Sequence, residues 1–343
     1  MVPALAVAGA LRAEGAQVEF VGAGRAEATL VPAAGFPLHA ISVEGLSRSN
    51  PLKALRALLR AALAVPRARR LLRRLRPDAV MGGGGYVAGP VALAAISLRI
   101  PLVLTEADSH LGLTNRLLAP FARRVCLSFP LPGRDGARYR VTGRPIPWPG
   151  RDRAAARGRL GIDAGETCVL VFGGSLGSRT INRAASEAFA GRSSTDSSFR
   201  VLHISGARDY AELQENDLRP GYDLREYLGQ EDFADALAAA DLAVARAGGS
   251  VFEIAAHGLP AVLVPYPHAS GDHQSANARW MSDAGAAVVI ADGELTAARL
   301  ARQVAELLAD RDALASMAAA AHGLARPDAA AEVARELLEA ARG

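Results

Sequence analysis

The chain has 343 residues, 50% of them hydrophobic and 22% charged, which is an ordinary globular composition with enough apolar material for about two domains. There is no uncharged apolar stretch of roughly 18 residues and no basic N-terminal region followed by an apolar run, which argues against a membrane-spanning helix and a secretory signal. Two cysteines, Cys126 and Cys168, are too few for a disulfide framework or a zinc cluster, so we expect a protein of the cytoplasm.

Short apolar runs alternate with longer Ala- and Leu-rich stretches of helical period, which is the pattern of βα units around a parallel sheet. In the first half we expect strands at 17–21, 38–41, 79–81, 102–105 and 124–127, with helices at 3–14, 52–75, 88–98 and 112–122. After a Pro- and Gly-rich segment the strands resume at 168–172, 200–204, 242–245, 261–264 and 287–290. The sequence therefore predicts two similar α/β halves joined at a Pro-rich hinge, residues 143–150.

The chain opens on a helical pattern, VPALAVAGALRAEG. A doubly wound domain normally opens on a strand, with a Gly-rich turn leading to its first helix. Either this domain has an unusual connection, or the chain begins one strand late.

Residues 51–76 carry nine basic side chains and no acidic one, whereas the rest of the chain has 30 basic and 35 acidic residues, a net charge of −5. This local cluster indicates a local anionic partner and not a nucleic acid. Leucines recur there at helical spacing and Pro66 is expected to interrupt the helix. A leucine stripe alone more often packs in a core, but with a polybasic flank it favours peripheral binding to anionic lipid, at about 1 kcal/mol per basic residue. The predicted membrane contacts are Leu55, Leu59, Leu63, Arg56, Arg60, Arg70, Arg73 and Arg74.

Two further segments follow predicted strands in the first half. Four consecutive glycines, residues 82–85, lose much chain entropy on folding and indicate a close approach by a ligand or a neighbouring segment. The segment TEADSH places Glu106, Asp108 and His110 where a parallel sheet holds its substrates, so they are candidates for general base and acceptor binding. The alternative is a solvated loop in which an Asp or Ser caps the helix near residue 112.

The strongest local signal is FGGSLGS at residues 172–178, which follows an apolar strand and precedes a helical run. Glycines allow the backbone to approach a phosphate, and Ser175 with the free N–H groups of the following helix can donate to its oxygens. The expected ligand is a diphosphate. A tight turn without a ligand is the alternative.

A second Gly-rich turn, RAGGS at residues 246–250, leads into a helix that places Glu253 about one turn inside. A carboxylate there can accept both hydroxyls of a ribose or simply complement the helix dipole, and the sequence leaves both interpretations open. Amides and imidazoles in the segment 264–277 suit a hydroxyl-rich ligand such as a sugar. For part of that segment, capping of a helix by Asp272 is the alternative.

Together, these motifs occur in an order that resembles the MurG family, the peripheral-membrane N-acetylglucosaminyltransferases that convert lipid I to lipid II in peptidoglycan synthesis. The resemblance spans nearly the whole chain, and its most specific blocks are GGSLGSRTIN, EIAAHGLP and HQSANA. It implies the α/β fold class GT-B, two Rossmann-like domains facing across a cleft. Residues 1–146 would bind the acceptor and the membrane, residues 147–325 would bind UDP-GlcNAc, and a C-terminal helix in residues 326–343 would pack back toward the first domain.

The resemblance also implies roles for individual residues. The donor would be bound by Gly174, Ser175 and Gly177 at its diphosphate, by Arg246, Gly249 and Ser250 in the second loop, by Glu253 at its ribose, and by His273, Gln274 and Asn277 near the GlcNAc. The acceptor side would include Gly83, Gly84, Tyr86 and Asn115.

The implied reaction is an inverting transfer of GlcNAc from UDP-GlcNAc to the MurNAc C4 hydroxyl of undecaprenyl-pyrophosphoryl-MurNAc-pentapeptide, on the cytoplasmic face of the cell membrane. A helix N-terminus and Arg246 would meet the charge of the leaving UDP, so no metal or other cofactor is obligatory. Members of the family carry a strand and a GGTGGH-like loop ahead of the helix VPALAV, with a histidine proposed to assist catalysis, and this sequence contains neither. The expected base is therefore Asp108, ahead of Glu106 and His110.

Two alternatives remain open from the sequence. One is a GT-B transferase with another lipid or small-molecule acceptor, because the donor half matches the family better than the acceptor half. The other is a catalytically inactive, membrane-associated protein that binds UDP-sugars.

Overall fold

A computed structural model describes the chain apart from residues 25–26, 42–50, 147–151, 175 and 192–198, and apart from the side chains of residues 51–62, 85–86 and 270. The chain divides into two compact units. The N-terminal unit comprises Met1–Ile146 together with Asp328–Gly343, and the C-terminal unit comprises Pro147–Pro327. Both units consist of parallel strands covered by helices.

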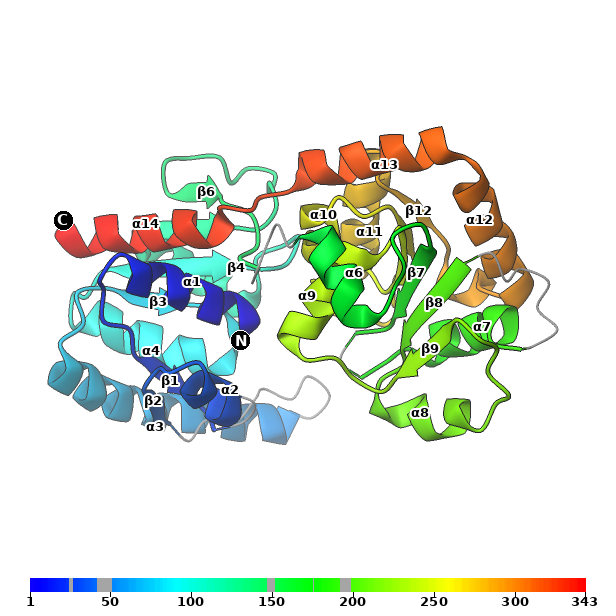
Figure 1. Cartoon of the computed structure of the whole chain (residues 1–343). Coiled ribbons are helices and arrows are strands. Elements are labelled where there is room, and N and C mark those ends of the chain that lie inside the picture. Colours follow the sequence, from blue (N-terminus) through cyan, green and yellow to red (C-terminus); the bar gives the residue numbers. More distant parts are fainter. Residues whose placement is uncertain (25–26, 42–50, 147–151, 175, 192–198) are drawn as a thin grey trace. The chain divides into compact units, whose positions relative to one another are not determined.

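The C-terminal unit contains a six-stranded parallel sheet (Figure 1). In spatial order its strands are β9 (Tyr222–Arg225), β8 (Phe199–Ile204), β7 (Thr167–Phe172), β10 (Leu242–Ala245), β11 (Ala261–Leu263) and β12 (Ala287–Val289). The chain builds outward from β7 to β9 and then from β10 to β12, so the strand order reverses between β7 and β10. Sheets of this order bind ligands at the carboxyl ends of the strands beside the reversal.

Helices cover both faces of this sheet (Figure 1). On one face, α7 (Arg179–Phe189) and α12 (Ala297–Ala309) share an apolar core with β7, β8 and β10. On the other face, α9 (Gln230–Ala239) packs against β7 and α6 (Arg153–Leu160) packs against α9. Because both faces are covered, the strand residues 168–172 are buried and read as one apolar run. The remaining helices are α8 (Ala207–Gln214), α10 (Val251–Ala256), α11 (His273–Asp283) and α13 (Arg311–Leu324), with 3₁₀ turns at Ser270–Asp272 and Asp292–Glu294.

The N-terminal unit holds its described strands in two parallel sheets. One pairs β1 (Phe20–Gly22) with β2 (Leu38–Ala40), and the other has the order β3 (Val80–Gly82), β4 (Leu102–Glu106), β5 (Arg124–Leu127) and β6 (Tyr139–Val141). Side chains alternate between the two faces of the larger sheet: Leu102 and Leu104 join one core cluster and Val103 joins another.

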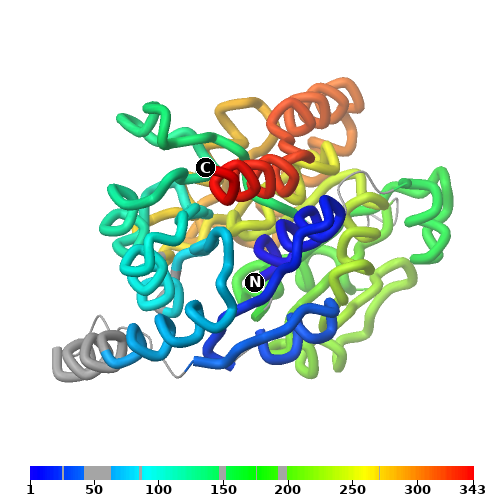
Figure 2. The backbone as a smooth tube through the Cα atoms, turned by 90° about the vertical axis from the view of Figure 1, so that its left-hand side faces the viewer, coloured from blue at the N-terminus to red at the C-terminus, as the bar shows by residue number. Residues whose placement is uncertain are grey.

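Different helices cover these two faces. The long helix α3 (Pro51–Leu75) and α4 (Gly85–Ser97) pack over Leu102 and Leu104. The first helix, α1 (Val2–Ala13), and the last, α14 (Ala329–Arg342), lie side by side over Val103 (Figures 1 and 2). An ion pair of 2.8 Å between Arg124 Nε and Glu336 Oε2 ties α14 to β5. The chain thus returns to its N-terminal unit at its end.

The expected elements occur close to their predicted bounds, and the helix near residue 112 is α5 (Leu113–Leu118) followed by a 3₁₀ turn at Ala119–Phe121. The prediction that Pro66 interrupts its helix is wrong, because α3 runs through it. Ala64, Ala68 and Leu72 lie on both sides of the proline and are buried in one cluster. Their packing offsets the backbone hydrogen bond that a proline cannot donate. The sequence analysis did not predict α2 (Glu27–Ala33), β6 or β9, and it gave no bounds for the helices between the strands of the second half.

Candidate functional site

In the N-terminal unit, the glycine loop after β3 and the polar segment after β4 lie at the same edge of the sheet, because β3 and β4 are parallel neighbours. A Cβ built on Gly84 would lie 3.8 Å from Asn115 Nδ2, and one built on Gly83 would lie 3.7 Å from Thr105 Oγ1. The structure therefore brings together Gly83, Gly84 and Asn115 of the predicted acceptor residues. The side chain of Tyr86 lies outside the described residues.

Glu106 is buried at the end of β4, and both of its carboxylate oxygens accept hydrogen bonds. Oε2 accepts from the Gly112 N–H and from Asn115 Nδ2, both at 2.9 Å, and Oε1 accepts from the Asp108 N–H at 3.2 Å. A carboxylate occupied in this way is poorly placed to take a proton from a substrate. The arrangement favours Glu106 as the group that shapes the loop.

Asp108 is half-buried and His110 is exposed. Neither side chain forms a hydrogen bond or an ion pair with a residue that the structure describes. The loop backbone beneath them is held by Glu106, while their own side chains remain available to a ligand. The helix that follows begins after Gly112 without a side-chain cap, so the alternative in which an Asp or Ser of this loop caps it is wrong.

In the C-terminal unit, the predicted donor segments meet at the carboxyl edge of the sheet. β7 and β10 are paired with Phe172 opposite Ala245, so residues 173–178 and 246–250 start from neighbouring points beside the strand-order reversal. β11 pairs with the other edge of β10, which brings in the segment after Leu263. This is the part of a doubly wound sheet where a nucleotide binds.

The first loop requires glycine at two positions. Gly174 and Gly177 have φ angles of +88° and +74°, in the left-handed region that glycine alone adopts without strain. The Gly177 N–H donates to the Gly174 carbonyl at 2.9 Å, which closes a tight turn. Ser178 then caps α7 by accepting from the Ile181 N–H, so unbonded N–H groups of the first helical turn lie beside the loop. Ser175 lies outside the described residues.

Arg246 of the second loop is buried and committed to protein partners. Its Nη1 donates to the carbonyl of Val264 at 3.1 Å and lies 2.6 Å from Asp292 Oδ1. Its guanidinium also lies over the ring of Tyr266, with 5.4 Å to the centroid. Arg246 therefore ties the second loop to the end of β11, a role that the sequence did not indicate because Asp292 is 46 residues away.

Replacing Arg246 with methionine is expected to lower the free energy of unfolding by about 3 kcal/mol or more, because the Asp292 charge and a buried carbonyl lose their partner. Urea unfolding measures the change. The matched control is Arg299→Met, which breaks an exposed pair with Glu294 at 2.8 Å and is expected to cost about 1 kcal/mol or less. Equal losses in the two variants contradict the assignment.

The predicted sugar-binding segment is joined to the second loop. Gln274 Oε1 accepts from the Tyr266 N–H at 2.9 Å, and its Nε2 would lie 3.9 Å from a Cβ on Gly248. Asn277 is buried and its Nδ2 donates to the Ala247 carbonyl at 3.0 Å. Asn277 thus fastens α11 to the loop, while Gln274 lies at the loop surface.

Four more predicted donor residues lie in this region. Gly249 and Ser250 precede α10, and Glu253 is half-buried in its first turn, beside the second loop. His273, also half-buried, is the first residue of α11. Asp272 occupies the N-cap position of α11, but its side chain accepts no backbone N–H of the helix; its Oδ1 accepts from Ser275 Oγ at 2.6 Å instead.

The turn of Ser205 and Gly206 also belongs to this edge, and sequence reasoning missed it. It follows β8, the neighbour of β7, and its backbone contacts the first loop. A Ser-Gly pair directly after an apolar strand was the available signal. The polar side chain of Asn182 behind the turn gave no signal, because an asparagine in a helix usually faces solvent.

Other reactive chemistry is limited. Burial raises the pKa of the Cys126 and Cys168 thiols to about 12, so both stay protonated at neutral pH. Among the residues that the structure describes, no group of three His, Cys, Asp or Glu side chains could hold a metal ion.

No helix of the described chain is both long enough and apolar enough to cross a membrane.

The domain profiles of one family match most of the chain: the glycosyltransferase family 28 N-terminal domain over residues 1–127 and its C-terminal domain over residues 168–333. A crystal structure of Acinetobacter baumannii MurG superposes with a TM-score of 0.74 at 30% identity, covering 98% of this chain and 95% of that one. The chain belongs to the MurG family. The predicted GT-B fold class is confirmed.

Curated relatives in this family are similar over nearly their full length. The protein of Alkalilimnicola ehrlichii is 44% identical over 99% of this chain and 95% of its own. The protein of Rubrobacter xylanophilus is 42% identical over 98% of this chain and 99% of its own. Both are named UDP-N-acetylglucosamine--N-acetylmuramyl-(pentapeptide) pyrophosphoryl-undecaprenol N-acetylglucosamine transferase.

Proposed function

We propose that this chain transfers GlcNAc from UDP-GlcNAc to the C4 hydroxyl of MurNAc in undecaprenyl-pyrophosphoryl-MurNAc-pentapeptide, lipid I, and so makes lipid II for peptidoglycan. Full-length relatives at 38–44% identity carry the name of this transferase. The structural observation that carries the proposal is the set of loops at the strand-order reversal of the C-terminal unit. There a glycine turn and the N-terminus of α7 form a site for a nucleoside diphosphate.

The donor is assigned to this unit residue by residue. The backbone of Gly174 and Gly177, with Ser175 between them, holds the diphosphate. Glu253 accepts the ribose hydroxyls, and Gln274 and His273 meet the hydroxyls of GlcNAc. Because Arg246 is bound to Asp292 and to a backbone carbonyl, it acts by shaping the second loop with Gly249 and Ser250. Asn277 secures the same loop through the Ala247 carbonyl.

The acceptor is assigned to the N-terminal unit, at the edge formed by Gly83, Gly84, Tyr86 and Asn115. Asp108 takes the proton of the MurNAc C4 hydroxyl, whose oxygen attacks the anomeric carbon of GlcNAc. The bond from that carbon to the diphosphate breaks, its electron pair leaves with UDP, and the configuration inverts. Glu106 holds the Asp108 backbone N–H and so places the base.

The leaving UDP gains negative charge as the bond breaks. N–H groups of the first loop and of the first turn of α7 are oriented before reaction, so they stabilise this charge without reorganisation. UDP-GlcNAc is the only small molecule that the donor site requires in this proposal, and no metal is obligatory.

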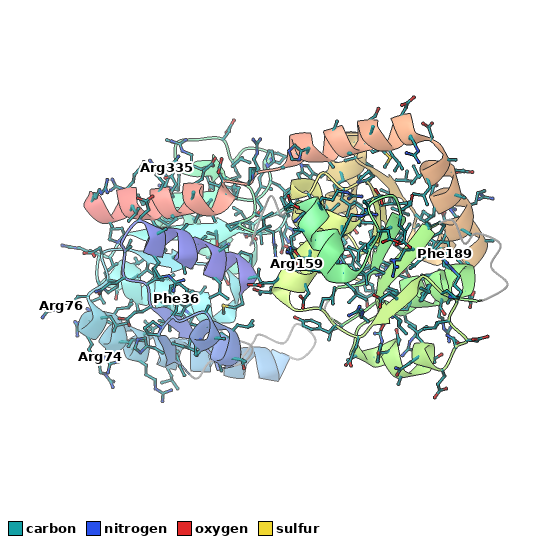
Figure 3. The ribbon with its side chains drawn as sticks, in the orientation of Figure 1. Phe36, Arg74, Arg76, Arg159, Phe189 and Arg335 are labelled. Atoms are coloured by element: carbon teal, nitrogen blue, oxygen red, sulfur yellow. The ribbon has the colours of Figure 1, made fainter. Side chains whose placement is uncertain are left out.

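We further propose that the enzyme acts peripherally on the cytoplasmic face of the cell membrane, through the helices that cover one face of the N-terminal sheet. The helices α3, α4 and α5 contain no acidic residue, whereas α14 on the other face contains three. Leu63 on α3 and the stripe Leu113, Leu117 and Phe121 are exposed. Figure 3 shows Arg74 near the C-terminal end of α3. Leu55, Arg56, Leu59 and Arg60 have side chains outside the described residues.

Changing the exposed residues Arg70, Arg73 and Arg74 together to glutamine is expected to lower binding to phosphatidylglycerol vesicles by about 100-fold, since each basic residue contributes about 1 kcal/mol near an anionic surface. Cosedimentation measures the binding, which should also weaken with salt. Changing three exposed arginines of the C-terminal unit, Arg302, Arg311 and Arg326, is the matched control. If both triple variants bind equally well, α3 is not the lipid contact.

A panel of acceptors tests the transferase itself. The chain is incubated with UDP-GlcNAc and, separately, with a lipid I analogue, other undecaprenyl-linked sugars and soluble sugars, and released UDP is measured. We expect release of UDP with the lipid I analogue and little with the others. Release with another acceptor alone supports the alternative of a different GT-B transferase. Binding of UDP-GlcNAc without release in any mixture identifies an inactive binding protein.

A further inference from the structure

The donor loop at residues 172–178 rests directly on the turn of Ser205 and Gly206. A Cβ built on Gly177 would overlap the carbonyl oxygen of Ser205, and one built on Gly206 would lie 2.5 Å from the Gly177 nitrogen and 2.7 Å from the Leu176 carbonyl carbon. With two backbones at this distance, the turn cannot shift without displacing Gly177. The position of the donor loop therefore depends on whatever holds Ser205.

Asn182 holds it. This side chain lies in the first turn of α7 and is 1% exposed. Its Nδ2 donates one hydrogen bond to the Ser205 carbonyl at 2.9 Å and another to Asp209 Oδ2 at 2.8 Å, while its Oδ1 lies 3.1 Å from His203 Nε2. The helix that begins at the end of the donor loop is thus joined, through one amide, to the turn on which the loop rests.

The direction of these bonds is determined. Asn182 Oδ1 can only accept, so His203 must donate from Nε2 and accept at Nδ1 from the Tyr222 hydroxyl, 2.6 Å away. Burial lowers the pKa of His203 to about 4 and raises the pKa of Tyr222 above its usual range, so both are neutral at pH 7. The chain from Tyr222 through His203 to Asn182 therefore fixes which end of the amide faces Ser205.

We propose that Asn182 is a positioning residue for the donor diphosphate, and that His203 and Tyr222 keep its amide in the orientation that this requires. The inference rests on the proposed function, because it takes residues 172–178 to be the diphosphate loop. Asn182 is buried beneath that loop, so it acts through the Ser205 carbonyl and Gly177 and not by contact with UDP.

The test uses Asn182→Leu, which keeps the side-chain size and removes all three hydrogen bonds. Affinities for UDP and for uridine are measured by calorimetry, together with kcat and the KM for UDP-GlcNAc. We expect UDP affinity to fall and the KM to rise by about tenfold or more, since a displaced loop loses its bonds to the diphosphate. Uridine affinity and kcat should change little. If Asn182 only stabilised the fold, less of the variant protein would be active and the measured kcat would fall, or the affinities for UDP and for uridine would fall together. Either result overturns the inference.

Two further variants complete the experiment. Ser186→Ala is the matched control on α7, because the Ser186 hydroxyl bonds only to the exposed Asn216 among described residues, at 3.2 Å, and UDP affinity should be unchanged. If Asn182→Leu does not fold, Tyr222→Phe takes its place. A selective loss of UDP affinity of about threefold or more then supports the inference, and an unchanged ratio of UDP to uridine affinity overturns it.

Failure of the inference can be separated from failure of the proposed function with Gly177→Ala, which alters the loop itself. If Gly177→Ala lowers UDP affinity and Asn182→Leu does not, the loop binds the diphosphate and Asn182 is not its positioning residue. If Gly177→Ala also leaves UDP affinity unchanged, the assignment of the loop is wrong.

Discussion

Asp108→Asn is expected to lower the kcat of GlcNAc transfer by about 100-fold or more, a typical loss on removal of a general base. An amide keeps the size of the side chain and cannot take the proton of the acceptor hydroxyl. UDP affinity should be unchanged, because the donor site belongs to the C-terminal unit. The variant should also fold normally, since the Asp108 carboxylate has no hydrogen-bond or ion-pair partner among the described residues.

The assay follows transfer of labelled GlcNAc to a lipid I analogue at saturating donor. Asp135→Asn is the control, because it removes an exposed carboxylate from the same unit and should keep the full rate. If Asp108→Asn keeps full activity and His110→Gln loses activity, the general base is His110 and not Asp108. Loss in Glu106→Gln accompanied by lower stability agrees with its hydrogen bonds to the loop and not with a role as base.

Gly177→Ala is expected to have the second large effect, a fall of about 100-fold in kcat/KM for UDP-GlcNAc. The residue has a φ of +74°, which costs a side chain about 1 kcal/mol or more, and its new Cβ would overlap the Ser205 carbonyl oxygen. Backbone cannot move aside as a flexible side chain does, so the loop itself must shift. A shift of about 1 Å in a positioning group lowers rates by about 100-fold.

Steady-state kinetics with varied UDP-GlcNAc measures this effect. The matched control is Gly158→Ala, at a helical glycine of the same unit where a Cβ meets no atom within 4 Å. The control should keep its activity and gain slightly in stability. Unchanged kinetics in Gly177→Ala contradict the assignment of the diphosphate loop.

Much of the fold was predictable because it depends on local pattern. The continuous apolar run at 168–172 directly indicates a buried strand, and the helical period of the Ala- and Leu-rich stretches directly indicates helices. By contrast, β6 and β9 are only three and four residues long and include charged residues, so their pairing depends on a neighbouring strand and not on a continuous apolar run. The prediction at Pro66 was wrong for the same reason. The helix continues because Ala64 and Ala68 pack into the apolar core of the N-terminal unit, which the local sequence does not show.

The candidate site was predictable only in its placement. Parallel strands put their following loops at one edge, so Gly177 and Arg246 were expected to lie near each other. What each side chain does there depends on partners far away in the sequence. Arg246 meets Asp292, Asn182 meets His203 and Ser205, and no spacing rule indicates such pairs. Glu106 was a candidate general base, yet its carboxylate oxygens accept hydrogen bonds within its own loop.

The central claim is that this chain is the transferase that makes lipid II, and the stereochemistry of the product tests it most directly. UDP-GlcNAc, an α-linked donor, is incubated with the chain and a soluble lipid I analogue, and the new linkage is analysed by NMR. The proposal predicts one UDP released per disaccharide and a β linkage from GlcNAc to the C4 oxygen of MurNAc. An α linkage, a link to another hydroxyl, or no disaccharide would contradict it.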